Sequence, residues 1–450
     1  MPTDSNGRSN GVNRRNFLAG VGAGAVASSL AGCIGGLGGG GGPIKIGAVF
    51  LLSGIAESLG RSSQAGAKLG VKDVNDAGGI DGRDVEIIFR DHEADPATAN
   101  KQFKSLVQEE NVDAMIGLTS SGVTLATAPT VEQLGVPMIL TDIGTPYITE
   151  FNYDKFGDFY NDDNGKAAGK KNIFRTNANT STNTYAMAKF AKEKLDGIER
   201  VANIGPDYAY GHQCWEYFKA YSKGMGSNYE FVESTFPSLG ASDMTPQINK
   251  VLDADPDLVF TSFWAGDAVT FVQQATAQGL FDKVSDVFDT LGADPTVFKA
   301  LGSSMPEGYH YSSWYWHSAY DNQNNTSFLD AFKKQYEGDP DTVNIPSFTG
   351  PSTYSAIWLY KQAIEAADGS TKPDDVISQL EGMSYEKDPR GPITISADSH
   401  QANAPTVIGS TSTGDDVPYD GVGLKPSYSY SMDRSTAVDL LQGSGLPPGV

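Results

Sequence analysis

Apolar runs that alternate with amphipathic stretches constrain the fold of this chain more than any other feature. Ile44 to Leu52 is a continuous apolar run, which suits a strand buried on both faces. From Ser62 to Asn75 apolar residues recur at helical spacing, and Gly78-Gly79 follows as a helix cap. The same pair of patterns then repeats. This alternation predicts an α/β fold with parallel sheets and helices on both faces.

The repeats form two series. The first continues over Val85 to Phe89, Pro96 to Glu109, Val112 to Ile116, Ser121 to Gln133 and Val136 to Leu140. The second covers Val201 to Ile204, Tyr210 to Tyr221, Phe231 to Phe236, Thr245 to Leu252, Leu258 to Phe263, Gly266 to Gln278 and Val284 to Asp289. Helical patterns at Ser327 to Tyr336 and Thr353 to Ala367 come next, and strand-like pieces follow near Ile393 and Tyr428. A chain of 450 residues exceeds one usual domain, so we expect two similar doubly wound lobes with a cleft where strand ends meet.

A polar break separates the two series. It runs from Asn152 to Lys171, and its centre, Asn161 to Gly165, is similar to a calcium loop. That motif needs an acid where Tyr160 stands and a glutamate where Lys171 stands. We therefore interpret residues 152–171 as a surface insertion and predict no metal site.

The first 33 residues have the order of elements typical of an export signal. Arg14-Arg15 precedes a short apolar run rich in glycine and alanine, which is the pattern of the twin-arginine route. Leu30-Ala31-Gly32-Cys33 resembles a lipobox, in which Cys33 carries a lipid anchor. The alternative is an ordinary basic start with a stray thiol. Residues 34–43 are mostly glycine and predict a tether, so we expect an exported protein held at the outer face of the cell membrane.

The charge of the chain narrows its setting and its partners. Acidic residues number 55 against 33 basic ones, which gives a formal net charge of −22, and the acids are spread along the chain. Such a surface repels nucleic acid. A diffuse acidic excess with few lysines keeps a protein hydrated in concentrated salt, so we infer a halophilic archaeon as the source. The alternative, recruitment of a cationic ligand, would cluster the acids in one segment.

Several short strings carry a family resemblance at matching spacing. They are Leu52-Ser53-Gly54 with Gly60, Asn75 to Arg83, Arg90 to Pro96, Val112 to Gly117 with Ser120-Ser121-Gly122, Gly135-Val136-Pro137, Phe174-Arg175-Thr176 and Tyr208 to Gly211. In these strings the chain resembles the periplasmic binding proteins for leucine, isoleucine and valine. The resemblance covers most of Ile44 to Gly308, and the glycine-rich string from Asn75 to Arg83 is its most specific part.

This resemblance implies a type I periplasmic-binding-protein fold, in which two lobes joined by three crossings close on a small solute. It implies an N-terminal lobe of residues 44–174 and 312–390 and a C-terminal lobe of residues 175–311 and 391–450. It also implies capture of an amino acid or a small carboxylate for an ABC permease with its ATPase subunits, without a cofactor.

Ser120 and Ser121 are the first candidate ligand residues. They lie with Gly122 between a buried strand and a helix start, where free backbone N–H groups and hydroxyls suit a carboxylate. Plain N-capping by Ser121 is the alternative, although one serine can cap while the other binds. The resemblance aligns Ser121 with a serine that holds the ligand carboxylate in relatives.

The next strand end supplies Asp142, Gly144 and Thr145. In the resemblance, Asp142 and Gly144 stand where relatives offer a backbone carbonyl and a threonine hydroxyl, and Thr141 or Thr145 can substitute. Asp142 at a cleft suits an ammonium group, while capping of the turn before Pro146 is an equally good alternative.

The second lobe supplies Tyr210, Trp264 and Asp289. Both aromatic residues come just after strand ends beside glycine, which favours exposure to the cleft over burial in the core. Leu59 stands where relatives often have a tyrosine. The acid that relatives use for the ammonium is not evident around Asp289 to Gly292, and Asp289 is the nearest candidate.

An enzyme and a sensor remain alternatives to a transport receptor. His212 and Cys214 suggest a thiol nucleophile, but two residues apart on a helix they face different directions, and a buried apolar role suits Cys214 better. We find no His-Glu-Xaa-Xaa-His, nucleophile-elbow or Walker motif, so we expect no enzyme. The same bilobed fold also serves tethered sensors, which neighbouring genes would reveal.

Overall fold

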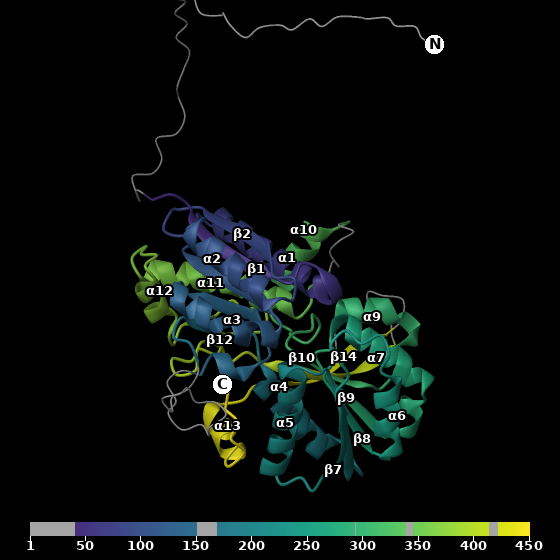
Figure 1. The fold of residues 1–450 in the computed structure, drawn as a ribbon. Helices are drawn as coiled ribbons and strands as arrows, with labels where there is room; N and C mark the ends of the chain where they lie inside the picture. The colour runs from purple at the N-terminus through teal and green to yellow at the C-terminus, as the bar shows by residue number, and fades with distance from the viewer. Residues whose placement is uncertain (1–40, 151–168, 293, 339–344, 414–421) are drawn as a thin grey trace, which may run out of the picture. The chain divides into compact units, whose positions relative to one another are not determined.

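The computed structural model describes residues 41–150, 169–292, 294–338, 345–413 and 422–450, and these residues build two α/β lobes around two main sheets (Figure 1). The α/β fold with two lobes predicted from the sequence is confirmed. Arg14, Arg15, Cys33, most of the glycine tether and most of the insertion at 152–171 lie outside the described residues, so the structure does not test them.

The first sheet is parallel and has the strand order β2-β1-β3-β4-β5. Its strands are β1 (Ile44–Phe50), β2 (Val85–Asp91), β3 (Ala114–Thr119), β4 (Met138–Asp142) and β5 (Ile173–Arg175). Strand β2 pairs with one side of β1, whereas β3, β4 and β5 follow on the other side. Right-handed crossovers therefore place α1 (Glu57–Asp76) on one face, and α2 (Pro96–Gln108) and α3 (Ser121–Leu134) on the opposite face.

Helices from late in the chain complete this lobe. They are α10 (Gln323–Tyr336), α11 (Thr349–Ala366) and α12 (Pro373–Leu380). Helix α11 lies tightly along α1, because a Cβ atom on Gly66 would come within 2.3 Å of the carbonyl oxygen of Gly350. The hydroxyl of Tyr360 on α11 donates to the carbonyl of Met115 in β3 at 2.7 Å. Helix α11 thereby holds the strand from which the site begins.

The second sheet has the strand order β14-β13-β10-β9-β8-β6-β7. Its parallel strands are β6 (Arg200–Ile204), β7 (Glu230–Thr235), β8 (Leu258–Thr261), β9 (Asp286–Thr290) and β10 (His310–Ser313). Two antiparallel strands, β13 (Thr406–Thr413) and β14 (Val422–Tyr430), extend one edge. Its helices are α4 (Thr180–Lys194), α5 (Ala209–Gly224), α6 (Thr245–Asp253), α7 (Ala265–Ala277), α8 (Leu280–Lys283), α9 (Pro295–Leu301) and α13 (Arg434–Leu440).

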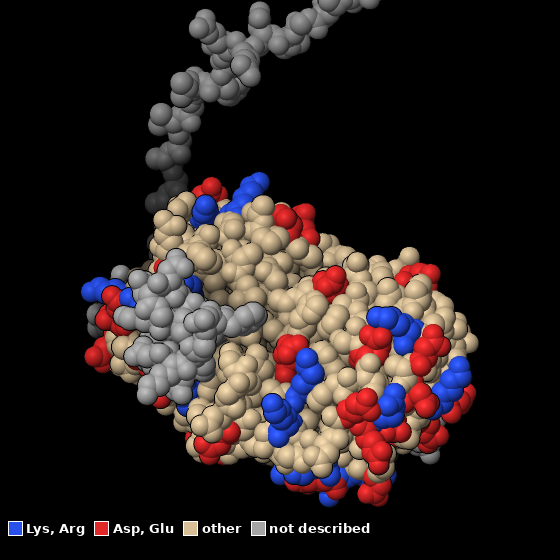
Figure 2. Space-filling model, turned by 60° about the horizontal axis from the view of Figure 1, so that its bottom comes forward, with Lys and Arg blue, Asp and Glu red and all other residues tan. Residues whose placement is uncertain are grey.

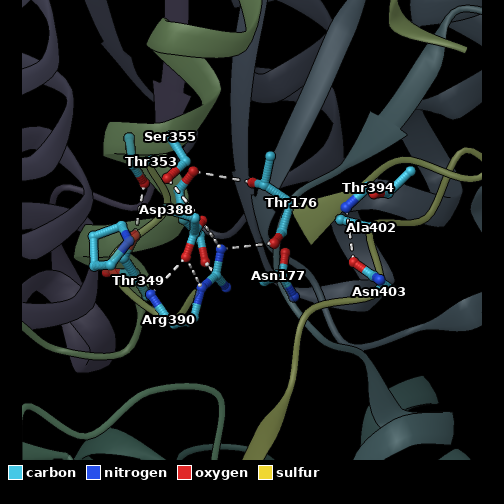
Figure 3. Close-up of polar contacts among 12 residues, drawn as sticks. Thr176, Asn177, Thr349, Thr353, Ser355, Asp388, Arg390, Thr394, Ala402 and Asn403 are labelled. Carbon is cyan, nitrogen blue, oxygen red and sulfur yellow. Dashed lines mark hydrogen bonds and ion pairs between the residues drawn. The ribbon is translucent and has the colours of Figure 1, made fainter. Parts of the chain in front are cut away.

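Within the described residues the chain passes between the lobes after β5, after β10 and after β12 (Ile393–Thr394), which pairs with β11 (Ser384–Tyr385). A buried ion pair lies beside the first passage. Figure 3 shows the Arg390 guanidinium between Asp388 and the backbone of Thr176. The lobe boundaries given above stay a prediction.

Short 3-10 turns cover several strand ends of the two lobes. They are η1 (Gly54–Ala56), η2 (Pro146–Ile148) and η3 (Gly302–Ser304).

On the face drawn in Figure 2, Asp and Glu side chains are scattered with Lys and Arg among them. The structure also has exposed ion pairs such as Lys72 with Asp76, 2.5 Å apart. Solvent screens such pairs, so they contribute little to stability.

Candidate functional site

A cavity lies where the carboxyl ends of strands from both sheets face each other. It has about 310 Å³ of empty space, its opening to solvent included, which is at the low end for small-molecule sites. Its lining is Leu59, Thr119, Ser120, Ser121, Asp142, Gly144, Tyr208, Tyr210, Trp264, Leu291, Trp314 and Phe348. Six of the eight ligand residues predicted from the sequence belong to this lining: Ser120, Ser121, Asp142, Gly144, Tyr210 and Trp264.

The start of α3 forms one wall. Ser120 is the N-cap residue, and its Oγ accepts from the N–H of Val123 at 3.5 Å. The capping alternative therefore applies to Ser120 and not to Ser121. The Oγ of Ser121 accepts from the N–H of Thr145 at 3.1 Å, which leaves its own proton for another acceptor. A hydroxyl at a helix N-terminus suits an anionic group.

Asp142 ends β4 beside this wall. Its side chain is buried, and Oδ2 has no hydrogen-bond partner among the described residues. Burial raises its pKa well above the usual range, the charge of Asp294 adds to the rise, and the hydroxyl of Thr119 on the paired strand opposes it. The described lining residues include no Lys, Arg or His. Asp142 is therefore a buried acid without a cation.

The turn after β4 does not use Asp142 as its cap. The side chain of Thr145 accepts from the N–H of Tyr147 at 3.4 Å, and its carbonyl accepts from Arg175 at 2.6 Å. Thr145 is fully buried and lies outside the cavity lining. It acts on the site indirectly, because its N–H holds Ser121.

Gly144 lets the two lobes approach closely. A Cβ atom there would lie 2.5 Å from the ring of Tyr210, so any larger residue would displace that ring. Tyr210 lies in the first turn of α5, and its hydroxyl is 2.9 Å from Thr290 Oγ1. The ring of Tyr210 thus covers the end of β4, while its hydroxyl is hydrogen-bonded inside the second lobe.

Trp264 precedes α7 and has its indole N–H directed to the hydroxyl of Tyr208 at 2.9 Å. Both rings line the cavity. Tyr208 also reaches the α3 wall, because a Cβ atom on Gly122 would lie 3.8 Å from its ring. Residues of the second lobe therefore close over the polar wall of the first.

Asp289 lies outside the cavity lining. It is fully buried in β9, where Tyr309 donates its hydroxyl to Oδ2 at 3.2 Å and burial raises the pKa of the carboxyl. Its neighbour Leu291 reaches the cavity instead. Of the two acids considered for an ammonium group, the structure brings only Asp142 to the lining.

The sequence analysis did not propose Thr119, Tyr208, Leu291, Trp314 or Phe348 as ligand residues. Thr119 adjoins Ser120, and Tyr208 lies two residues before Tyr210, so strand-end logic applied two residues more widely would have found them. Trp314 follows β10 and Phe348 precedes α11, in segments without clear periodicity. The indole N–H of Trp314 is buried and has no hydrogen-bond partner among the described residues.

The structure also bears on the enzyme alternative. Cys214 is fully buried in α5, and burial raises the pKa of its thiol to about 12, which opposes a nucleophilic role. His212 instead contacts Asp207, with its Nε2 2.8 Å from Oδ1. The part of the chain that the structure describes holds no group of acidic, histidine or cysteine residues suited to a metal ion. Among the same residues, no helix is long and apolar enough to span a membrane.

Comparisons with known proteins agree with this geometry. The family model described as periplasmic binding protein matches residues 43–415. Leu/Ile/Val-binding protein homolog 4 from Brucella abortus is 25% identical over 413 residues, which cover 89% of this chain and 92% of that protein.

Two solved structures share the fold. The solute-binding protein of an ABC transporter from Rhodopseudomonas palustris BisB5, in complex with 3,4-dihydroxybenzoic acid, has a TM-score of 0.73 and 24% identity, with 86% of this chain and 97% of that one covered. The leucine-binding protein from Thermotoga maritima MSB8 has a TM-score of 0.70 and 21% identity, with 85% and 97% covered. The chain therefore belongs to the periplasmic binding protein family, among the ABC-transporter substrate-binding proteins that include the Leu/Ile/Val-binding proteins.

Proposed function

We propose that this protein captures a zwitterionic amino acid, branched-chain or related, between its two lobes and delivers it to an ABC permease. The observation that carries the proposal is the position of Asp142 beside the serines at the start of α3. Ser120 and Ser121 would receive the carboxylate, and Asp142 would receive the ammonium group. Thr119 of β3 is paired with Asp142 of β4, so the serines that follow Thr119 lie at the same end of the sheet as the carboxyl of Asp142.

The names of the structural neighbours include aromatic acids as well as leucine. An aromatic acid has a carboxylate and no ammonium group. Bound in this cavity, it would place a second negative group near Asp142 without any lining cation to offset it. The chemistry of the lining residues therefore favours an amino acid over a benzoate.

Closure of the lobes is the proposed mechanism. The ligand first meets Ser121 and its neighbours, and Tyr210 and Trp264 of the second lobe then cover its side chain and exclude water. These contacts exist only in the closed state, so the ligand shifts the population toward that state, which docks on the permease and its ATPase subunits. We expect binding without turnover.

The proposal includes location. Arg14 and Arg15 would direct export, and Cys33 would carry the lipid anchor that holds the receptor near its permease. Residues 44–174 with 312–390 and residues 175–311 with 391–450 would form the two closing lobes. Asp142, and not Asp289, is the proposed partner of the ligand ammonium.

Replacing Ser121 with alanine tests the carboxylate site. The substitution removes one hydroxyl contact to the ligand and the acceptor for the Thr145 N–H. We expect the dissociation constant of the amino acid that binds best in a thermal-shift screen, run in high salt, to rise by about tenfold or more in calorimetry. Thr127→Ala, which removes a buried hydroxyl further along α3, is the control. Unchanged affinity in Ser121→Ala would contradict the assignment.

The raised pKa of Asp142 predicts a pH-dependent affinity. Below this pKa the carboxyl is protonated, so binding of an ammonium group requires the release of a proton, and affinity is expected to fall by about tenfold per pH unit. Above the pKa the affinity levels off. Titrations from mildly acidic to neutral pH should show this profile for the wild type, and a flat one for Asp142→Asn. A flat wild-type profile over a range that includes acidic pH would refute the ionised role of Asp142.

A further inference from the structure

Four aromatic side chains of the cavity form two pairs. Trp264 and Tyr208 are joined by the indole hydrogen bond of 2.9 Å. Trp314 and Phe348 pack edge to face, with ring centroids 5.3 Å apart and planes at 85°. All four rings line the cavity, and Tyr210 adds a fifth.

Asp142 lies near both pairs. Asp142 and the rings of both pairs line the same cavity. Asp294, whose charge adds to the raised pKa of Asp142, accepts a hydrogen bond from Ser347, the residue before Phe348. The buried acid and the four aromatic rings therefore face one cavity.

The indole N–H of Trp314 has no partner among the described residues, but as a donor it cannot accept a hydrogen bond from an ammonium group. Trp264 donates to Tyr208, and the Tyr210 hydroxyl is paired with Thr290. Near Asp142, Oδ2 of Asp142 is a lining side-chain oxygen that has no hydrogen-bond partner among the described residues. A primary ammonium group has three N–H donors to satisfy, whereas a quaternary ammonium group has none. The rings offer faces, which attract a cation directly.

We propose that the cavity prefers amino acids whose nitrogen carries alkyl groups, with the alkylated ammonium held against Tyr208, Trp264, Trp314 and Phe348 and with Asp142 as its counter-charge. This inference rests on the proposed amino-acid function and specifies the class of amino acid. A cation over several aromatic faces is attracted more strongly when it is desolvated than at an exposed site. The Asp142 carboxylate supplies the opposite charge without requiring a hydrogen bond.

A series of ligands with one carboxylate tests the preference. Glycine, N-methylglycine and N,N,N-trimethylglycine differ in alkylation of the nitrogen, and 3,3-dimethylbutanoate has the shape of trimethylglycine without its positive charge. Calorimetry on the full chain in high salt is expected to show affinity that rises along the series. Trimethylglycine should bind at least about tenfold more tightly than glycine and than 3,3-dimethylbutanoate.

The outcomes separate this inference from the proposed function. If glycine, valine or leucine binds as tightly as trimethylglycine or more so, the preference is refuted and the amino-acid function stands. If 3,3-dimethylbutanoate binds as tightly as trimethylglycine, the cavity recognises shape and the positive charge is irrelevant. This outcome also refutes the preference. If 4-hydroxybenzoate binds and no amino acid does, both proposals fail.

A pair of variants separates the aromatic faces from simple packing. Phe348→Leu keeps an apolar side chain and removes a ring face, whereas Leu291→Ile changes an aliphatic lining residue at constant volume. Phe348→Leu is expected to lower the affinity for trimethylglycine by about fivefold and the affinity for 3,3-dimethylbutanoate by less than about twofold. Leu291→Ile should leave the ratio of the two affinities unchanged. Equal weakening of both ligands by Phe348→Leu would reduce its role to packing and refute the cation contact.

Discussion

Replacing Asp142 with asparagine is expected to weaken the binding of a zwitterionic amino acid by about 30-fold to several thousand-fold, because it leaves a buried ammonium group without its counter-charge. Asparagine has nearly the same shape, so the cavity keeps its volume. The variant should fold at least as well as the wild type, since it removes an acid that is buried without a cation. Calorimetric titration with the amino acid that binds best measures the loss.

Asp289→Asn is the matched control. Asp289 is also a buried acid near the end of a strand, and burial raises its pKa as well, but it lies outside the cavity lining. Its substitution should change the dissociation constant by less than about twofold. For an aromatic acid such as 4-hydroxybenzoate we expect the opposite effect of Asp142→Asn. Loss of the Asp142 charge would strengthen the binding of this acid. Strengthened binding of the amino acid in Asp142→Asn would exclude Asp142 as the ammonium partner.

The comparison of these two acids shows what the sequence can and cannot predict. Both follow apolar strand residues, so both were reasonable candidates. Successive side chains of a strand point to opposite faces, and Asp289 points to Tyr309 inside its own lobe while Asp142 reaches the cavity. The geometry of each strand end decides whether its acid points toward the partner lobe. The order of residue types does not encode this geometry directly.

The strands and helices were predictable where one face is apolar. Helix α2, predicted over Pro96 to Glu109, is confirmed at Pro96–Gln108. Helix α4 was missed because it is buried on nearly every side, with polar Thr180 to Thr184 among its buried residues, so no apolar stripe appears. Strand β13 was missed because an antiparallel strand, here between β10 and β14, breaks the expected repeat. Helical periodicity detects helices with one exposed face and fails for a helix such as α4, whereas buried strands are detected as continuous apolar runs.

The cavity was predictable in part for a topological reason. Parallel strands present their carboxyl ends at one edge, so residues after β3, β4, β6 and β8 had to meet. Trp314 and Phe348 could not be placed in this way. Phe348 adjoins α11, which reaches the first lobe only after the chain has passed through the second. The aromatic pairing that supports a cation preference is therefore a property of the assembled lobes.

Replacing Arg390 with methionine should produce the largest loss of stability among the changes considered. Its guanidinium donates to both oxygens of Asp388 at 2.8 and 2.7 Å, to Ser352 Oγ at 3.0 Å and to the Thr176 carbonyl at 3.1 Å. Both charged side chains are fully buried, and Ser355 donates to Asp388 as well (Figure 3). Removing the cation leaves a buried carboxylate and an unpaired carbonyl, which costs about 3 to 5 kcal/mol.

The free energy of unfolding from urea titration measures this loss, and an exposed ion pair provides the control. Lys72→Met breaks the pair with Asp76, in which 59% and 66% of the two side chains are exposed, and should leave the free energy of unfolding nearly unchanged. The double variant Asp388→Leu with Arg390→Met should recover much of the stability, because it removes the orphaned charge. A cost below about 1 kcal/mol for Arg390→Met would show that the passage beside Thr176 is held by packing alone. A large cost would show that the fold depends on this buried ion pair beside the first passage between the lobes.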